Sequence, residues 1–210
     1  MRPTPAQLRA LARQDPLLGE SLAAHGPYPE FPTPALRRWS HYQSLSRAIV
    51  FQQLAGKAAT TIFNRVCALT PGSAFPKPEE FLRLAEARLR GAGLSHNKFL
   101  ALRDLAEREA RGDLKLRGVA RLEDAEVVER LVQVRGIGEW TAQMFLLFRL
   151  GRLDVLAPGD LGVQEGMKRL YDLKDRPTPK QVEARGAAWA PLRSIGTWLM
   201  YREVDTKTPA

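Results

Sequence analysis

Apolar residues recur every three or four positions along most of the chain, with polar residues between them. This spacing is the period of an amphipathic helix, and the alternating β-branched runs that would indicate strands are absent. The pattern therefore predicts an all-α fold. The expected helices cover residues 5–14, 16–25, 34–54, 57–69, 78–86, 96–111, 124–134, 139–149, 161–171, 178–189 and 191–203.

One of the predicted connections, in the segment LVQVRGIGEWTA at residues 131–142, is very short. Gly136 and Gly138 flank Ile137, and glycine reaches positive φ at little steric cost, so these residues allow a hairpin too tight for larger side chains. The first backbone amides of the next helix are then unpaired and partly positive, which suits a phosphate oxygen. Taken alone, such a turn is only a weak indication of DNA binding.

Composition adds two pieces of information. The 210 residues suffice for one domain or for two lobes, and a net charge of +9 with a pI of about 10.1 favours a nucleic-acid partner. A generally basic, solvated surface is the alternative reading of that charge. The single cysteine, Cys67, excludes an internal disulfide and a cysteine-ligated iron–sulfur cluster.

The chain shows neither a signal-peptide pattern at its beginning nor an apolar run long enough to cross a bilayer. We therefore expect an intracellular, cytoplasmic protein with no membrane partner, associated with the nucleoid if its source is bacterial.

The hairpin, the loop Ala157-Pro158-Gly159 and the following Asp160 together resemble the helix-hairpin-helix superfamily of DNA glycosylases. That superfamily is named for such a hairpin, a Gly/Pro-rich loop and a catalytic aspartate. Further similarity to alkylbase glycosylases lies in residues 45–59, 93–106 and 189–201, so the resemblance covers about residues 35–203 in the right order. It is strongest to the 3-methyladenine DNA glycosylase II (AlkA) type, in a compact form without an N-terminal β-domain.

This resemblance implies two helical lobes around a DNA-binding cleft. We expect residues 1–39 to form N-terminal helices that pack with the C-terminal lobe, and residues 40–150 to form the central lobe. The helix-hairpin-helix would occupy residues 124–149, and residues 151–210 would carry the aspartate loop and the C-terminal helices. The implied partner is double-stranded DNA with alkylated bases, bound by a monomer.

Asp160 is the catalytic residue that the resemblance implies. Loss of a base leaves a sugar with oxocarbenium character, and a carboxylate near C1′ stabilises this charge and can orient the attacking water. The alternative role for Asp160 is to cap the helix that begins near Leu161. Both roles can hold at once, because a carboxylate at a helix N-terminus is favoured in its charged form.

Trp140 determines the expected subclass. In relatives that also cut the DNA backbone, a lysine at this position forms a Schiff base, so tryptophan implies base release by water alone. The indole can stack on an extruded cationic purine, with a cation–π contribution of about 0.5–2 kcal/mol. Tyr201, Met144 and Leu161 would complete the base pocket. Core packing remains the alternative for both Trp140 and Tyr201.

The resemblance also assigns DNA contacts. Leu54 would enter the vacated base stack, with Gln53 beside it, although Leu54 could instead pack against the next helix. The remaining expected DNA contacts are Gly136, Ile137, Gly138 and Thr141. Backbone carbonyls of Val132, Val134 and Gly136 would bind a structural Na⁺ or K⁺.

The sequence thus predicts a monofunctional DNA glycosylase that excises 3-methyladenine-type and 7-methylguanine-type bases in base excision repair. It needs no cofactor beyond the possible hairpin cation and has no iron–sulfur cluster. The first alternative is a non-catalytic helix-hairpin-helix module that recognises damaged or distorted DNA. The second is an enzyme for mismatched or oxidised bases, whose members usually carry an iron–sulfur loop, a catalytic lysine or both.

Overall fold

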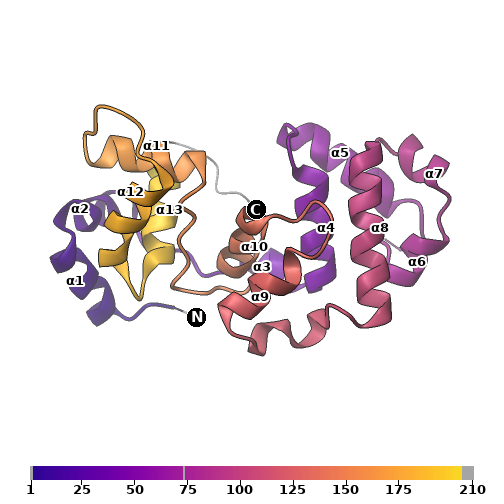
Figure 1. The fold of residues 1–210 in the computed structure, drawn as a ribbon, viewed down its shortest axis with the longest axis horizontal. Helices are drawn as coiled ribbons and strands as arrows, with labels where there is room; N and C mark the ends of the chain where they lie inside the picture. Colours follow the sequence, from indigo (N-terminus) through magenta and orange to yellow (C-terminus); the bar gives the residue numbers. More distant parts are fainter. Residues whose placement is uncertain (1, 73, 205–210) are drawn as a thin grey trace. The chain divides into compact units, whose positions relative to one another are not determined.

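The computed structural model describes residues 2–72 and 74–204, and none of these residues lies in a strand. The all-α prediction is confirmed. The chain divides into two compact helical units (Figure 1): unit 1 comprises residues 1–33 and 143–210, and unit 2 comprises residues 34–142. The divisions fall before Pro34 and before Gln143 rather than after residues 39 and 150.

Unit 2 is built around one long helix. Leu102 and Leu105 of α8 are fully buried, as are Leu45 and Ile49 of α4. A second part of the core is aromatic: Phe63, Phe75 and Phe81 stack in sequence. The helices of this unit are α3 (Pro34–Arg37), α4 (His41–Phe51), α5 (Gly56–Cys67), α6 (Pro78–Arg83), α7 (Glu86–Gly91), α8 (His96–Arg111), η1 (Leu116–Arg121), α9 (Asp124–Leu131) and the beginning of α10 (Glu139–Met144).

Unit 1 is centred on the packing of α11 against α13. Nearly every residue of α13 is buried, including Trp198 and Tyr201, because neighbouring helices cover it on several sides. A β-carbon on Gly166 would lie 2.6 Å from Met200 Cα, so glycine is what allows the backbones of α11 and α13 to approach. The helices of this unit are α1 (Pro5–Gln14), α2 (Pro16–His25), η2 (Phe145–Arg149), α11 (Leu161–Leu170), α12 (Pro179–Gly186), η3 (Ala187–Trp189) and α13 (Arg193–Glu203).

Most predicted helices are present, with a few differences. The predicted helix 34–54 is two helices, because Ser40 accepts a hydrogen bond from the Gln43 amide and begins α4 afresh. The segment 78–86 likewise ends at Arg83, and α7 and η1 were not predicted. The second helix of the hairpin starts as α10 and continues as the π-helical turn η2.

None of the helices in residues 2–72 and 74–204 is both long enough and apolar enough to cross a membrane. Over the same ranges, histidine, cysteine, aspartate and glutamate side chains do not gather in groups of three or more that could hold a metal ion.

Candidate active site

In unit 1, Asp160 is held at the start of α11 by its own helix. Its backbone is extended, and its Oδ1 accepts a hydrogen bond from the Val163 amide at 2.9 Å. The preceding loop is fixed too, because Gln164 Nε2 donates to the Pro158 carbonyl at 2.9 Å and Asp160 N donates to Ala157 O at 3.1 Å. Asp160 is therefore an N-cap, as its alternative role required, and it is only 8% exposed.

The second oxygen of Asp160 is bound by Tyr201. The buried phenol hydroxyl of Tyr201 donates to Asp160 Oδ2 at 2.8 Å, and it lies 3.4 Å from the Met144 sulfur. Gly162 makes this arrangement possible, since a β-carbon there would stand 3.0 Å from both Asp160 Oδ1 and the Tyr201 ring. The structure thus joins three predicted site residues, Asp160, Tyr201 and Met144, in one buried cluster.

This cluster fixes the direction of a buried carboxylate. One oxygen accepts from a backbone amide and the other from a hydroxyl, so the acid cannot rotate without losing a hydrogen bond. A carboxylate in such a low-dielectric setting attracts a nearby cation more strongly than it would in water. Leu161, the next residue, is 64% exposed, which leaves a large apolar side chain in solvent beside the acid.

In unit 2, the hairpin forms where the glycines predicted it. Gly136 has a φ of +77°, and its Cα faces Ala101, whose Cβ would lie 3.1 Å from an added β-carbon. The Ile137 amide donates to Val134 O at 3.0 Å, and α10 begins at Glu139. Ile137 is only 3% exposed, and its predicted contact with DNA stays a prediction.

Trp140 and Thr141, at the beginning of α10, face different surroundings. Trp140 is 41% exposed, which is unusual for so large an aromatic side chain, so its ring is not fully buried in the core. Thr141 is buried, and its hydroxyl lies 3.5 Å from Gln52 Nε2. The predicted contact of Thr141 with DNA therefore concerns a side chain covered by the protein itself.

The predicted wedge is a turn between α4 and α5. Gln53 has a left-handed backbone, with φ at +54°, and Leu54 is 39% exposed. Gln52 Nε2 donates to the Gly136 carbonyl at 2.9 Å, which ties the turn to the hairpin. Lys98 Nζ donates to the carbonyls of Val50 and Gln52 at 2.8 and 2.7 Å. Burial lowers the pKa of Lys98.

Sequence reasoning did not single out Gln52 or Lys98 as supports of this turn. Both lie in segments predicted as ordinary helix, and nothing in the helical period identifies a lysine that reaches a neighbouring helix end. The carbonyls predicted to bind a cation are partly engaged: Val134 O accepts from Ile137 N and Gly136 O accepts from Gln52. The cation site stays a prediction.

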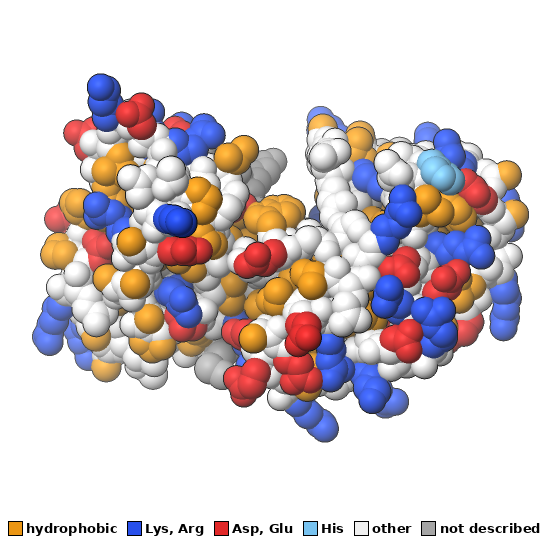
Figure 2. Space-filling view, in the orientation of Figure 1, with side chains coloured by type: hydrophobic (Ala, Val, Ile, Leu, Met, Phe, Trp, Pro, Cys, Tyr) orange, Lys and Arg blue, Asp and Glu red, His pale blue; other side chains and the backbone are white. Residues whose placement is uncertain are grey.

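Charge alone does not mark a DNA surface on the face shown in Figure 2. Acidic side chains gather over α9, whose first turn contains Asp124 and Glu126, and basic and acidic side chains alternate over α6 to α8. Several arginines there form ion pairs on their own helix, as Arg103 does with Glu107 at 2.9 Å. The hairpin geometry is thus more informative than net charge.

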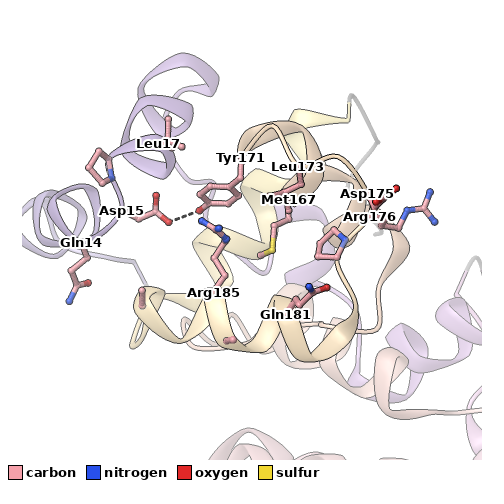
Figure 3. Close-up of a pocket in the computed structure, with 14 residues that line it drawn as sticks. Gln14, Asp15, Leu17, Met167, Tyr171, Leu173, Asp175, Arg176, Gln181 and Arg185 are labelled. Carbon is pink, nitrogen blue, oxygen red and sulfur yellow. Dashed lines mark hydrogen bonds between the residues drawn. The ribbon is translucent and has the colours of Figure 1, made fainter.

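Unit 1 also contains a cavity of about 920 Å³ between α1, α2, α11 and α12 (Figure 3). Asp15 binds both the Tyr171 hydroxyl and Trp189 Nε1 at its edge, and the Arg185 guanidinium lies 4.0 Å from the centre of the Tyr171 ring. None of the predicted site residues is among those that line it, so it is separate from Asp160.

A family model described as HhH-GPD superfamily base excision DNA repair protein matches residues 46–191. These residues contain the predicted wedge turn, the hairpin and Asp160. The chain belongs to the HhH-GPD superfamily. The resemblance seen in the sequence is therefore confirmed.

Other HhH-GPD proteins are similar over most of the chain. DNA-3-methyladenine glycosylase 1 of Schizosaccharomyces pombe is 35% identical over 172 residues, which is 81% of this chain and 75% of that protein. The structure of 3-methyladenine DNA glycosylase (Mag1) from the same yeast, in complex with abasic DNA, has a TM-score of 0.84 at 31% identity and covers 98% of this chain and 99% of that chain. A DNA-3-methyladenine glycosidase from Bacillus halodurans also gives 0.84, at 35% identity, covering 95% and 88%.

Proposed function

We propose that this HhH-GPD protein is a monofunctional DNA glycosylase of the 3-methyladenine DNA glycosylase II type, which hydrolyses the N-glycosidic bond of alkylated bases in double-stranded DNA. The observation that carries the proposal is the buried Asp160 carboxylate, held by Val163 and Tyr201. The names of similar proteins, DNA-3-methyladenine glycosylases from two yeasts, support the substrate class.

The proposed reaction depends little on a general acid and strongly on an anion near the sugar. An N3- or N7-alkylated purine is a cation, so the glycosidic electron pair leaves with the base and yields a neutral alkylpurine. Positive charge passes to the sugar as an oxocarbenium ion, and Asp160 stabilises it. Water then adds to C1′, and its proton passes to Asp160 or to solvent. The products are a free base and an uncut abasic strand.

Residues outside this cluster select and expose the base. The Trp140 indole, already exposed, stacks on the extruded cationic purine. Tryptophan cannot form a Schiff base, so no strand cleavage follows base release. Leu54 fills the gap in the duplex, and the amides at the start of α10 bind a phosphate. The protein acts as a monomer on duplex DNA.

The decisive experiment replaces Asp160 by asparagine and measures single-turnover base release from a duplex with one 7-methylguanine. Asparagine can still cap α11 but lacks the charge, so release should fall by about 100-fold or more, while binding to an abasic-site duplex should survive. Asp172→Asn is the matched control, because Asp172 is exposed, has a left-handed backbone that asparagine tolerates, and has no proposed role.

If the Asp160→Asn variant keeps more than about a tenth of wild-type activity, Asp160 does not supply the main electrostatic stabilisation. Borohydride treatment during turnover tests the monofunctional part separately. We expect no covalent protein–DNA adduct, and a trapped adduct would show that an amine of this chain reaches C1′.

A further inference from the structure

Helix α8 contacts both of the elements proposed to read DNA, the wedge turn (residues 52–54) and the hairpin (residues 135–138). At its first turn, Lys98 Nζ donates to the carbonyls of Val50 and Gln52. Three residues later, Ala101 packs against Gly136. Three residues further on, Asp104 Oδ2 accepts a hydrogen bond from the Arg135 amide at 2.8 Å.

Lys98 provides hydrogen-bond partners for carbonyl groups at the C-terminal end of α4. The last carbonyls of a helix lack partners within the helix, and they carry partial negative charge. The Lys98 ammonium binds two carbonyls in this region, so it acts as a C-terminal cap supplied by another helix. Burial of the ammonium lowers the pKa of Lys98, and the two hydrogen bonds give its charged group partners inside the protein.

The wedge turn has few supports of its own. Gln53 is a non-glycine residue with φ at +54°, a conformation that costs of order 1 kcal/mol unless its surroundings impose it. The N-cap residue of α5, Ala55, has no side chain able to cap that helix. The Leu54 amide donates to Phe51 O at 3.4 Å, and two contacts with other segments add to this bond: Lys98 binds the Gln52 carbonyl, and Gln52 Nε2 donates to the Gly136 carbonyl.

We propose that Lys98 is a positioning residue for base extrusion. It holds the wedge turn in register with the hairpin, so that Leu54 enters the base stack while the hairpin grips the adjacent phosphates. The inference rests on the proposed glycosylase function but concerns extrusion, not bond cleavage. A turn without this support would lose conformational entropy as it became ordered during extrusion, which would make extrusion less favourable. Lys98 assists extrusion because it holds the turn in place before the base leaves the stack.

The test compares two substrates that differ only in the difficulty of extrusion. One duplex carries 7-methylguanine paired with cytosine, and the other carries the same lesion as a single-nucleotide bulge. Lys98→Met removes the ammonium while keeping a long side chain. We expect its kcat/KM to fall by about tenfold or more on the paired lesion and by less than about twofold on the bulged lesion, since the bulged base is extruded at lower cost.

Two controls separate positioning from general damage to the fold. Arg103→Met removes another α8 cation, one that forms an ion pair with Glu107 on its own helix, and it should leave activity on both substrates unaffected. Lys98→Arg keeps the charge and should recover most of the activity on the paired lesion. Thermal melting of each variant sets an assay temperature at which all are folded.

An equal loss on both substrates would overturn the inference, as would a Lys98→Met variant that matches wild type on both. Either result leaves the proposed function intact, because the wild-type protein still releases the base. If the wild-type protein releases neither lesion, the proposed function itself fails, and the two failures are thus distinguishable.

Discussion

Gly162→Ala is the smallest change that should disturb the chemistry without unfolding the protein. Gly162 lies in the first turn of α11, two residues after Asp160, on the side that faces Tyr201. A β-carbon there would lie 3.0 Å from Asp160 Oδ1 and 3.0 Å from Tyr201 Cε1. Ordinary contacts of a carbon with these atoms are about 3.5 Å, so one of the two side chains must shift by roughly half an ångström.

Any such shift strains the 2.8 Å hydrogen bond between Tyr201 and Asp160 or turns the carboxylate. Misplacement by about 1 Å commonly costs about 100-fold in rate, so roughly half of that displacement should cost about tenfold. The fold should be nearly unaffected. Crowding costs about 1 kcal/mol here, while alanine gains a similar amount over glycine in helix propensity.

The assay is single-turnover base release together with thermal melting, and Gly166→Ala provides the contrast. Gly166 lies one helical turn further along α11, but its added β-carbon would meet the backbone of Met200, 2.6 Å from its Cα. Backbone cannot rotate away, so α11 and α13 must separate. We expect a loss of about 3 kcal/mol in the free energy of unfolding and a melting temperature lower by about 6–12 °C.

We expect the two variants to differ in what they lose: Gly162→Ala should lower the rate of base release, and Gly166→Ala should lower the melting temperature. If Gly162→Ala keeps more than about half of its activity while its melting temperature is unchanged, the Tyr201–Asp160 hydrogen bond does not orient the acid. If the Gly162→Ala variant melts as early as Gly166→Ala, the close approach at Gly162 is structural only.

Four further outcomes are expected. Leu54→Ala should lower base release from duplex DNA by about tenfold with little change in melting temperature, because Leu54 is substantially exposed; a large fall in stability would make it a core residue. Trp140→Ala should weaken binding of cationic lesions by about threefold to thirtyfold, checked by competition against undamaged duplex. Released bases should follow leaving-group quality, with 3-methyladenine fastest, 7-methylguanine slower, and uracil or 8-oxoguanine scarcely detected by chromatography. Asp154→Asn should lower the free energy of unfolding at neutral pH, because hydrogen bonds from Arg193 lower the pKa of Asp154 in the folded protein. This loss of stability should be complete above pH 3.8, the ordinary pKa of the group, and should disappear in acid melts as the pH falls through the lowered pKa of the folded state.

Much of the fold could be predicted because its signals are local. Helices α1, α2 and α8 begin and end where a cap, a proline or a glycine is found: Thr4 caps α1, Asp15 caps α2, and Ser95 and Gly112 bound α8. Short helices were harder. The segment Glu86–Gly91 has no side-chain cap and a single buried apolar residue, so its helicity depends on packing against α8, which a period cannot reveal.

The candidate site shows the same division. Asp160 was predicted because it follows a Gly/Pro loop that resembles the one in helix-hairpin-helix DNA glycosylases, and Gly136 because a tight hairpin requires positive φ. The bond from Tyr201 to Asp160 joins residues 41 positions apart, and the contact of Lys98 with the end of α4 depends on which face α8 presents. One signal was available: Gly162 and Gly166 are four residues apart, a spacing that places both on one face of a helix and indicates a close neighbour.

The two helix N-termini after the hairpin and after the loop argue against a protein that only binds DNA. At α10 the chain enters the helix from glycine, without a carboxylate cap from Gly138, which suits a phosphate. At α11 the same kind of position is filled by Asp160, whose charge repels phosphates. A module that only recognised distorted DNA would bind better with asparagine there, since asparagine also caps helices. A buried carboxylate at this position weakens DNA binding, and yet hydrogen bonds hold both of its oxygens. A reaction explains it, because a sugar that loses a cationic base becomes positive and is stabilised by an anion.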